Sequence, residues 1–275
     1  MMQFQTNDGS GAHIGFEVIE DVLPQDTMFI HGNMASNRWW YPAADVWRKK
    51  ASGQRLPGAM ILAELRGCGK SSAPRDQADV DMHLFAQDFI GLAKSLKRGK
   101  IHLVGHSTGG LIVALMLAKA PELFEKAVLL DPVGAKGVTF NDAMTDAFEQ
   151  MKTNRGLVSI VIGSTIRGYD TQSEFFDQVI VADAFLAAQT VGDKVLRALD
   201  GLDSRNEVSK VKHAVLVLHG EHDLLLPIVD SQEMASLMSN ARFEVVPEQG
   251  HCTNLENPEK FVLIADKFLF SGSGA

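Results

Sequence analysis

Three residue types that together can activate a hydroxyl group for attack on a carbonyl occur in the order Ser107, Asp223, His251. Ser107 lies within Gly105-His106-Ser107-Thr108-Gly109, which has the G-x-S-x-G spacing of a sharp strand-to-helix turn. A serine hydroxyl is a weak nucleophile until a base accepts its proton, and a histidine base needs an acid that fixes its tautomer. The spacing therefore predicts a nucleophilic serine with two remote partners.

The sequence around Ser107 also predicts the local structure that this chemistry requires. Residues 101–106 are mostly apolar and partly β-branched, as in a buried strand, and an apolar run rich in helix formers follows Gly110. The sharp turn strains the serine backbone, and glycines at positions 105 and 109 let the strand and the helix approach each other. The first amides of the helix then point to the space where an oxyanion would form.

The other candidate residues also follow predicted strands. The apolar pattern predicts strands at 13–20, 27–30, 59–65, 101–106, 126–130, 214–218 and 243–246. Strands that alternate with helices predict an α/β fold with a mostly parallel sheet, whose strands end at one shared edge. We expect this edge to bring together five residues that are far apart in the sequence: Asn33, Ser107, Asp131, Asp223 and His251.

The alternation of strands and helices breaks between about residues 134 and 210. Helices are expected at 142–151, 174–188 and 193–199, and 158–162 fits either a strand or a helix. Because strands resume near His213, we expect a core made of 1–134 and 211–275 and a helical cap at 135–210. Such a cap can exclude water and shape a pocket.

Composition narrows the range of partners. The net charge of −8 argues against a general affinity for nucleic acid or for an anionic membrane surface. Two cysteines are too few for a secreted fold built on disulfides, and the polar N-terminus lacks the features of a signal peptide. No apolar run approaches the ~20 residues that span a bilayer. We therefore expect a cytoplasmic protein with free thiols and with neither nucleic-acid nor membrane partners.

Two other motifs suggest ligands but lack required residues. Gly69-Lys70-Ser71-Ser72 is similar to the end of a phosphate-binding loop, but the glycine required five positions before Gly69 is replaced by Glu64. His219 and His222 could form a metal pair, yet no third and fourth ligands stand at a recognisable spacing. We therefore expect neither a cofactor nor a metal ion.

Several conspicuous residues are interpreted as structural. His31 is expected to brace its own turn, and His106 to pack with its side chain facing away from Ser107. Cys252 is expected to be a small buried residue rather than a reactive thiol. The three tryptophans are expected to pack in the core rather than contact substrate: Trp39, Trp40 and Trp47.

With these motifs the sequence resembles the α/β-hydrolase fold superfamily, in particular its cap-bearing carboxylesterase and lactonase-like members. The resemblance covers nearly the whole chain and rests on five segments: His31-Gly32-Asn33, 64–71, 105–109, 220–223 and Gly250-His251. It implies that Ser107 is the nucleophile, Asp223 the orienting acid and His251 the base. It also implies an oxyanion hole made of the Asn33 and Thr108 backbone amides.

Three departures or ambiguities accompany the resemblance. Asp131 occupies an alternative acid position of the family, but chain order and motif favour Asp223. Glu64 stands where the family usually has aspartate, which we interpret as a structural variation. In the similar haloalkane dehalogenases, an asparagine at the position of Asn33 binds halide. Their nucleophile is aspartate, so Ser107 speaks against that chemistry.

The resemblance implies a serine hydrolase that cleaves an ester or lactone of a small, largely apolar substrate through an acyl-enzyme, without a cofactor. A thioesterase or a carbon-carbon bond hydrolase would share the same residues. A slow-turnover hormone-type receptor and a cofactor-free haloperoxidase also keep the triad. The natural substrate and the oligomeric state are left open by the sequence.

Overall fold

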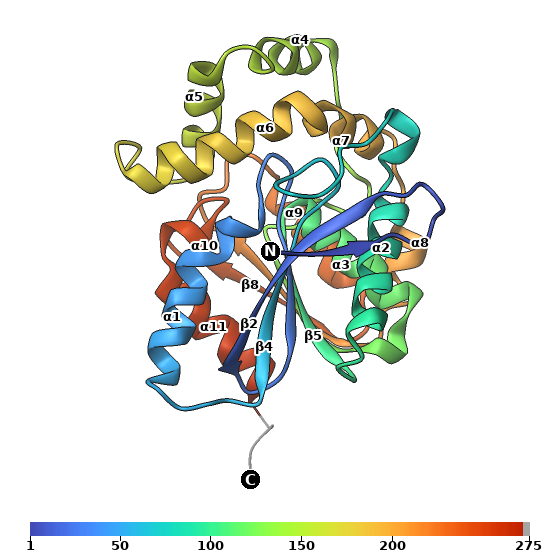
Figure 1. The fold of residues 1–275 in the computed structure, drawn as a ribbon, viewed down its shortest axis with the longest axis vertical. Helices are drawn as coiled ribbons and strands as arrows, with labels where there is room; N and C mark the ends of the chain where they lie inside the picture. Colours follow the sequence, from blue (N-terminus) through green and yellow to red (C-terminus); the bar gives the residue numbers. More distant parts are fainter. Residues whose placement is uncertain (272–275) are drawn as a thin grey trace.

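The computed structural model describes residues 1–271, which form a twisted eight-stranded sheet covered by helices on both faces (Figure 1). The order of the strands across the sheet is β1-β2-β4-β3-β5-β6-β7-β8. Their bounds are β1 (Met2–Gln5), β2 (His13–Leu23), β3 (Thr27–Ile30), β4 (Gly58–Ala63), β5 (Ile101–His106), β6 (Phe124–Leu130), β7 (Ala214–Gly220) and β8 (Ala241–Val246). β2 pairs antiparallel with β1 and β4, and all other neighbours are parallel. This confirms the predicted mostly parallel sheet.

The centre of the sheet is buried on both faces. Every residue of β3, β4 and β5 is buried. Parallel strands covered by helices on both sides have continuous apolar sequences rather than alternating ones, because neither face meets water. The carboxyl ends of β3, β5, β6, β7 and β8 therefore lie along one edge, as expected. Residues 272–275, the end of the expected second core segment, lie outside the described residues.

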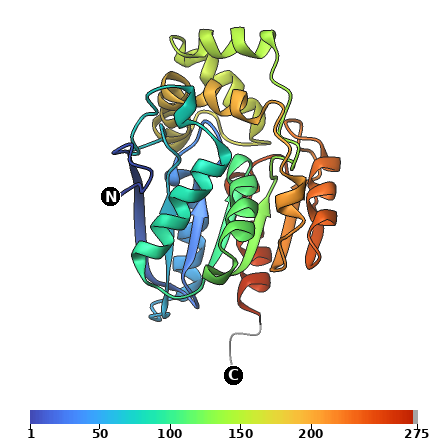
Figure 2. The same ribbon diagram turned by 90° about the vertical axis from the view of Figure 1, so that its right-hand side faces the viewer.

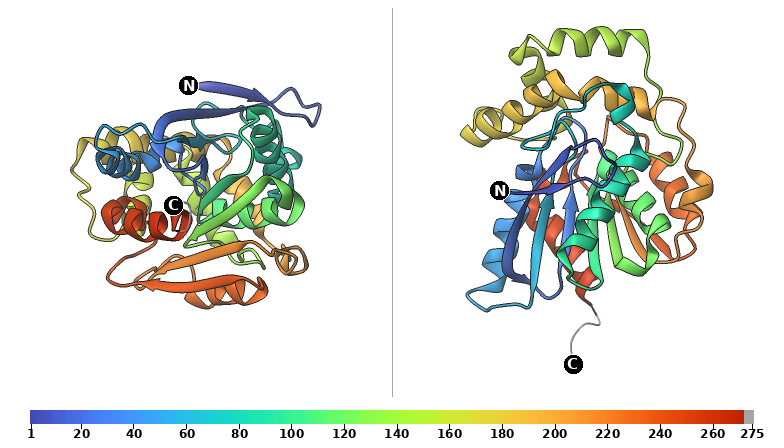
Figure 3. Two further views of the ribbon diagram at one scale, coloured as in Figure 1. Left: turned by 90° about the horizontal axis from the view of Figure 1, so that it is seen from below. Right: turned by 45° about the vertical axis from the view of Figure 1, so that its right-hand side comes forward.

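One face of the sheet is covered by α1 (Tyr41–Ala51) and α11 (Pro258–Phe270), which lie side by side in Figure 3. The rings of Trp40 and Trp47 contact Phe29 edge to face, with centroids 5.4 and 5.5 Å apart. Both rings also lie against Phe261 of α11. Trp39 is buried as well, so the prediction that the tryptophans pack in the core is confirmed.

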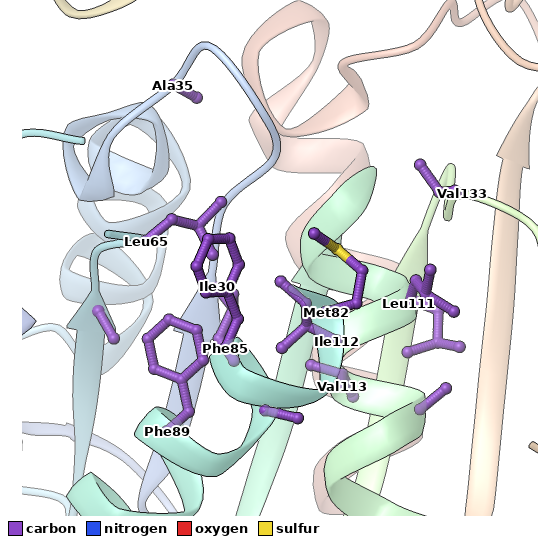
Figure 4. Packing of buried hydrophobic residues seen from close by; sticks show 14 of the residues in the cluster. Ile30, Ala35, Leu65, Met82, Phe85, Phe89, Leu111, Ile112, Val113 and Val133 are labelled. Carbon is purple, nitrogen blue, oxygen red and sulfur yellow. The ribbon is translucent and has the colours of Figure 1, made fainter. Parts of the chain in front are cut away.

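The other face is covered by α2 (Met82–Leu96), α3 (Thr108–Lys119) and α9 (Ile228–Leu237), and Figure 2 shows α2 and α3 in front of the strands. Figure 4 shows Phe85 and Phe89 of α2 beside Ile30 of β3, and Ile112 on α3 nearby. α3 is buried along residues 108–117. This accounts for its apolar sequence on every side, because neighbours cover the whole helix.

A helical insertion, residues 142–208, connects β6 to β7 and lies over the carboxyl edge of the sheet (Figure 1). It contains α4 (Asp142–Met151), α5 (Arg155–Thr165), the π-helical η4 (Phe176–Val181), α6 (Ala182–Thr190), α7 (Gly192–Leu199) and α8 (Arg205–Val208). The side chains of Asn141 and Asn154 accept amide hydrogen bonds that start α4 and α5. Residues 158–162 are helical, which decides the alternative left open by the sequence.

Candidate active site

Ser107 occupies a strained turn between β5 and α3. Its backbone has φ 55° and ψ −121°, in a region that non-glycine residues seldom adopt. The turn is held from both sides, since the Ser107 amide donates to Leu130 O at 2.9 Å and Ser107 O accepts from the Val133 amide at 3.0 Å. A Cβ atom on Gly109 would lie 2.5 Å from His31 O. The predicted need for a small residue at that position is therefore confirmed.

The loop after β3 packs directly on this turn. A Cβ atom on Gly32 would lie 2.8 Å from the Cβ of Ser107, so only glycine leaves room for the serine. Among residues 1–271, neither the Asn33 amide nor the Thr108 amide donates a hydrogen bond to another protein group. Two donors thus remain available beside the hydroxyl, one at the loop and one at the start of α3.

The Asn33 side chain is turned toward the helical insertion. Its Nδ2 donates to Gly192 O at 2.9 Å, and its Oδ1 accepts from the Met34 amide at 3.0 Å. Both ends of the carboxamide are therefore engaged by protein groups, unlike an asparagine side chain that is free to bind halide.

His251 and Asp223 form a buried pair at the ends of β8 and β7. His251 Nδ1 lies 2.7 Å from Asp223 Oδ2, and the other oxygen of Asp223 accepts from the amides of Leu225 and Leu226 at 2.7 and 3.1 Å. Burial alone would raise the pKa of Asp223, but the His251 hydrogen bond and charge, together with the two amides, lower the pKa below its usual value. Asp223 is therefore a stable carboxylate that can orient the imidazole.

Ser107 and His251 are not hydrogen-bonded to each other, although the residue before Ser107 contacts His251. Within residues 1–271, the Ser107 hydroxyl has no hydrogen-bond partner. The adjacent residue, His106, links the two segments: its Nε2 lies 2.9 Å from His251 O, and the two rings are 4.9 Å apart. Burial lowers the pKa of His106 to about 3, so the ring is neutral and donates to that carbonyl. His106 thus packs in the interior as expected, and it also contacts His251.

Asp131, the alternative acid, lies at the same edge in a different environment. It has φ 43° and is fully buried, and its Oδ1 accepts from the Gly220 amide at 2.7 Å. Its Oδ2 has no hydrogen-bond partner among residues 1–271. Asp131, Asp223 and His251 nevertheless lie close together, since one N or O atom of each lies within 4.8 Å of those of the other two. Burial and the Asp223 charge raise the pKa of Asp131 well above its usual value, so this environment disfavours a charge on the carboxyl.

The three other histidines considered in the sequence, His31, His219 and His222, have distinct surroundings. His31 Nδ1 contacts Gly32 O at 2.7 Å and its Nε2 accepts from the Leu65 amide, so the prediction that it braces its turn is confirmed. Burial lowers the pKa of His31 to about 4. His219 is buried, with its Nδ1 2.9 Å from Ser231 Oγ. His222 is partly exposed, and its Nε2 lies 3.9 Å from an oxygen of Glu221 and of Glu248.

Neither cysteine has the environment of a reactive thiol. Cys68 and Cys252 are buried, and burial raises the pKa of each thiol, Cys252 well above its usual value. Glu64, near Cys68, is buried too, and its Oε2 accepts from the Lys70 amide at 2.6 Å. Burial raises the pKa of Glu64 to about 7. The 64–72 segment therefore holds a buried acid in a turn rather than a phosphate site.

A cavity of about 590 Å³ reaches His251 from the surface. Its walls are residues 163–168 of the helical insertion and, from the core, His222, Leu224, Leu225, Gly250 and His251. Leu224 is 94% exposed and Leu225 52%, although they come immediately after Asp223, whose side chain is buried. Both leucines therefore add apolar surface to the wall of the cavity. These leucines could not be predicted as site residues, because no motif marks a leucine as exposed.

The fold and this constellation define an α/β hydrolase, and the comparison with known proteins agrees. Residues 28–263 match the alpha/beta hydrolase family, so the chain belongs to that family. Within residues 1–271, no helix is both long enough and apolar enough to cross a membrane.

Relatives within the family differ in activity. The chain is 26% identical over 257 residues to 2-hydroxymuconate semialdehyde hydrolase of Pseudomonas sp. (strain CF600), covering 90% of this chain and 88% of that protein. It is also 26% identical over 233 residues to carboxylesterase YbfK of Bacillus subtilis (strain 168), covering 84% and 76%. Protein ABHD8 of Bos taurus is 26% identical over 249 residues, but the chain spans only 55% of its length.

Solved structures share the fold at low sequence identity. The esterase EaEST from Exiguobacterium antarcticum superposes with a TM-score of 0.78 at 22% identity, covering 96% of this chain and 97% of that one. The enol-lactonase from Burkholderia xenovorans LB400 gives a TM-score of 0.76 at 19% identity, covering 98% of this chain and 99% of that one. These likenesses establish the fold and leave the substrate of this chain open.

Proposed function

We propose that this chain is a serine hydrolase that cleaves a carboxylic ester or a lactone of a small, largely apolar substrate. Ser107 attacks the carbonyl carbon, His251 accepts the hydroxyl proton and returns it to the leaving group, and Asp223 orients the imidazole. Water then releases the acyl-enzyme. The observation that carries the proposal is the Asp223–His251 pair, whose buried side chains lie 2.7 Å apart and which the His106 contact joins to the strained turn that holds Ser107.

The free amides of Asn33 and Thr108 support the same chemistry. Attack on a carbonyl places negative charge on its oxygen, and preformed N–H donors stabilise that charge without reorganising. Removing one such donor costs a serine hydrolase about 3 kcal/mol of transition-state stabilisation. A Cβ on Gly32 would come within 2.8 Å of Ser107, so the loop lies close enough to place its next amide beside the hydroxyl.

The proposal requires the serine and the imidazole to come within hydrogen-bonding reach during the reaction. In the resting structure, the Ser107 hydroxyl has no partner among residues 1–271. Catalytic hydrogen bonds often tighten only when substrate is bound. We expect a rotation of the Ser107 hydroxyl or a small shift of His251 to close the gap.

The cavity at His251 supports an apolar substrate, although Ser107 is not among its lining residues. Its volume of about 590 Å³ falls within the range that holds small ligands. Leu224 and Leu225 place apolar surface at its wall, directly after the acid. The carboxylesterase among the relatives has the activity that this arrangement supports.

A second candidate is hydrolysis of a carbon-carbon bond, because one relative is a 2-hydroxymuconate semialdehyde hydrolase that matches 90% of this chain. Turnover of 2-hydroxymuconate semialdehyde at a higher kcat/KM than any ester or lactone would favour this candidate. Turnover of esters alone would favour the first.

The experiment that tests the proposal is a panel of nitrophenyl esters and lactones, assayed with wild type and with Ser107→Ala. We expect wild type to hydrolyse esters of short apolar acids or small lactones, and Ser107→Ala to lose that activity. Thermal unfolding of both proteins serves as the folding control. Equal turnover by the two proteins would refute the assignment of Ser107 as nucleophile.

A further inference from the structure

We propose that the helical insertion holds the oxyanion loop, residues 32–38, in its productive conformation, and that Asn33 and Asp183 are the positioning residues. This inference rests on the proposed function, because it assigns a role to the loop that carries the Asn33 amide. The contacts join residues 145 to 159 positions apart in the sequence. They tie both ends of the loop to the insertion.

The first contact fixes the start of the loop. Asn33 Nδ2 donates to Gly192 O, the first residue of α7, at 2.9 Å. Its Oδ1 accepts from the Met34 amide at 3.0 Å. The side chain is thus clamped between the insertion and the next peptide, and this limits rotation of the backbone that carries the Asn33 N–H.

The second contact fixes the end of the loop. Asp183 of α6 is 4% exposed and accepts from Ser36 Oγ and from two guanidinium nitrogens of Arg38, with Nε at 3.1 Å. Ser36 also accepts from the Arg38 amide at 3.1 Å and so starts the short helix η1 (Asn37–Trp40). A two-pronged pair between arginine and carboxylate fixes direction as well as distance. Asp183 therefore sets where the loop joins η1.

Between the two contacts the loop is strained. Met34 has φ 61°, in the left-handed region that non-glycine residues avoid. Such a conformation persists when the surrounding structure holds it. The insertion leaves a space for Met34, since a Cβ on Gly192 would lie 2.7 Å from Met34 Sδ. Without its contacts to the insertion, the loop is expected to relax and to turn the Asn33 amide away from Ser107.

The test compares variants that break these contacts with a control that breaks another one. Asn33→Ala and Asp183→Asn each weaken one end of the loop. Gln77→Ala is the matched control, because Gln77 Nε2 donates to Lys194 O at 3.0 Å and so joins the core to α7 of the insertion without a hydrogen bond to residues 32–38. For each protein, kcat and KM are measured separately on a nitrophenyl ester, with circular dichroism and thermal unfolding as folding controls.

We expect Asn33→Ala and Asp183→Asn each to lower kcat by about 10- to 100-fold, up to the loss seen when an oxyanion donor is removed, with KM nearly unchanged. Gln77→Ala should keep the wild-type kcat. Three results would overturn the inference. The first is a wild-type kcat in both loop variants, and the second is an equal fall in kcat for Gln77→Ala. The third is a rise in KM confined to Asn33→Ala, which would mean that this side chain contacts the substrate.

Ser107→Ala separates this inference from the function on which it rests. If Ser107→Ala turns over as fast as wild type, the proposed function fails and the inference fails with it. If Ser107→Ala is inactive and both loop variants are as active as wild type, only the inference fails. In Asp183→Asn, Arg38 loses the charge of its buried partner, and this loss could prevent folding. If that variant does not fold, the comparison of Asn33→Ala with Gln77→Ala decides the outcome.

Discussion

Replacing Asp223 by asparagine should abolish most of the activity, and the same change at Asp131 should not. Asp223 accepts a 2.7 Å hydrogen bond from His251 Nδ1, and its lowered pKa keeps it ionised across the neutral range. Asparagine in its place carries no charge and can present an N–H to the imidazole. The ring then adopts the wrong tautomer, with its proton on the nitrogen that must accept from Ser107.

The magnitude follows from this geometry. In a serine protease, the corresponding loss of the acid lowers kcat by about 10⁴-fold, or ~5 kcal/mol at 1.36 kcal/mol per factor of ten. We expect a loss of that order for Asp223→Asn. Burial and the Asp223 charge raise the pKa of Asp131 well above its usual value, so removing a carboxylate charge matters less at position 131 than at position 223. The amide oxygen can still accept from Gly220 N, and we expect a fall in kcat below about tenfold.

The assay is kcat and kcat/KM on one nitrophenyl ester at neutral pH, with urea unfolding of each variant to confirm that it is folded. Asparagine suits position 131, because it tolerates the φ of 43° found there. The reasoning would be refuted if Asp131→Asn were inactive and Asp223→Asn retained wild-type kcat, since the acid would then be Asp131.

Three further predictions concern stability and substrate choice. Glu64 has a pKa of about 7 in the folded protein against a usual 4.5, so its protonated form stabilises the fold. This contribution is fully present below pH 4.5 and is lost as pH rises through 7. Between pH 4.5 and pH 8, the free energy of urea unfolding should therefore fall by about 3 kcal/mol more for wild type than for Glu64→Gln. Equal falls in the two proteins would contradict this prediction. Gly109→Ala places a Cβ 2.5 Å from His31 O and should lower the free energy of unfolding by on the order of 3 kcal/mol. Wild-type stability of this variant would show that the turn can open. Leu224→Ser should raise KM more for esters of longer acids than for acetate, and an equal effect on both would exclude contact with the acyl chain.

The framework of the site was predictable because it depends on local patterns. Apolar runs identified the central strands, and the sheet edge followed from the alternation of strands and helices. Gly105 and Gly109 marked the turn at Ser107, because only glycine fits where backbone oxygens approach this closely. The helix at 158–162 was ambiguous, since a short apolar run suits either structure, and its surroundings in the fold decide between them.

Contacts between distant segments were not predictable. Nothing in the sequence shows that Asp183 faces Ser36 and Arg38, or that the Asn33 side chain turns to Gly192. The raised pKa of Asp131 depends on burial and on the charge of Asp223, and both arise only when the chain folds. Exposure of Leu224 is also a property of the folded surface. These features depend on tertiary packing, for which a single sequence carries no periodic signal.

The most direct test of the central claim is to treat the protein with a fluorophosphonate and to locate the adduct by mass spectrometry of its peptides. We expect one adduct per chain, on Ser107, formed at the same rate at which ester hydrolysis is lost. Ser107→Ala should acquire no adduct and should be inactive. An adduct on another residue that abolishes activity, or continued ester hydrolysis after Ser107 is fully modified, would contradict the account.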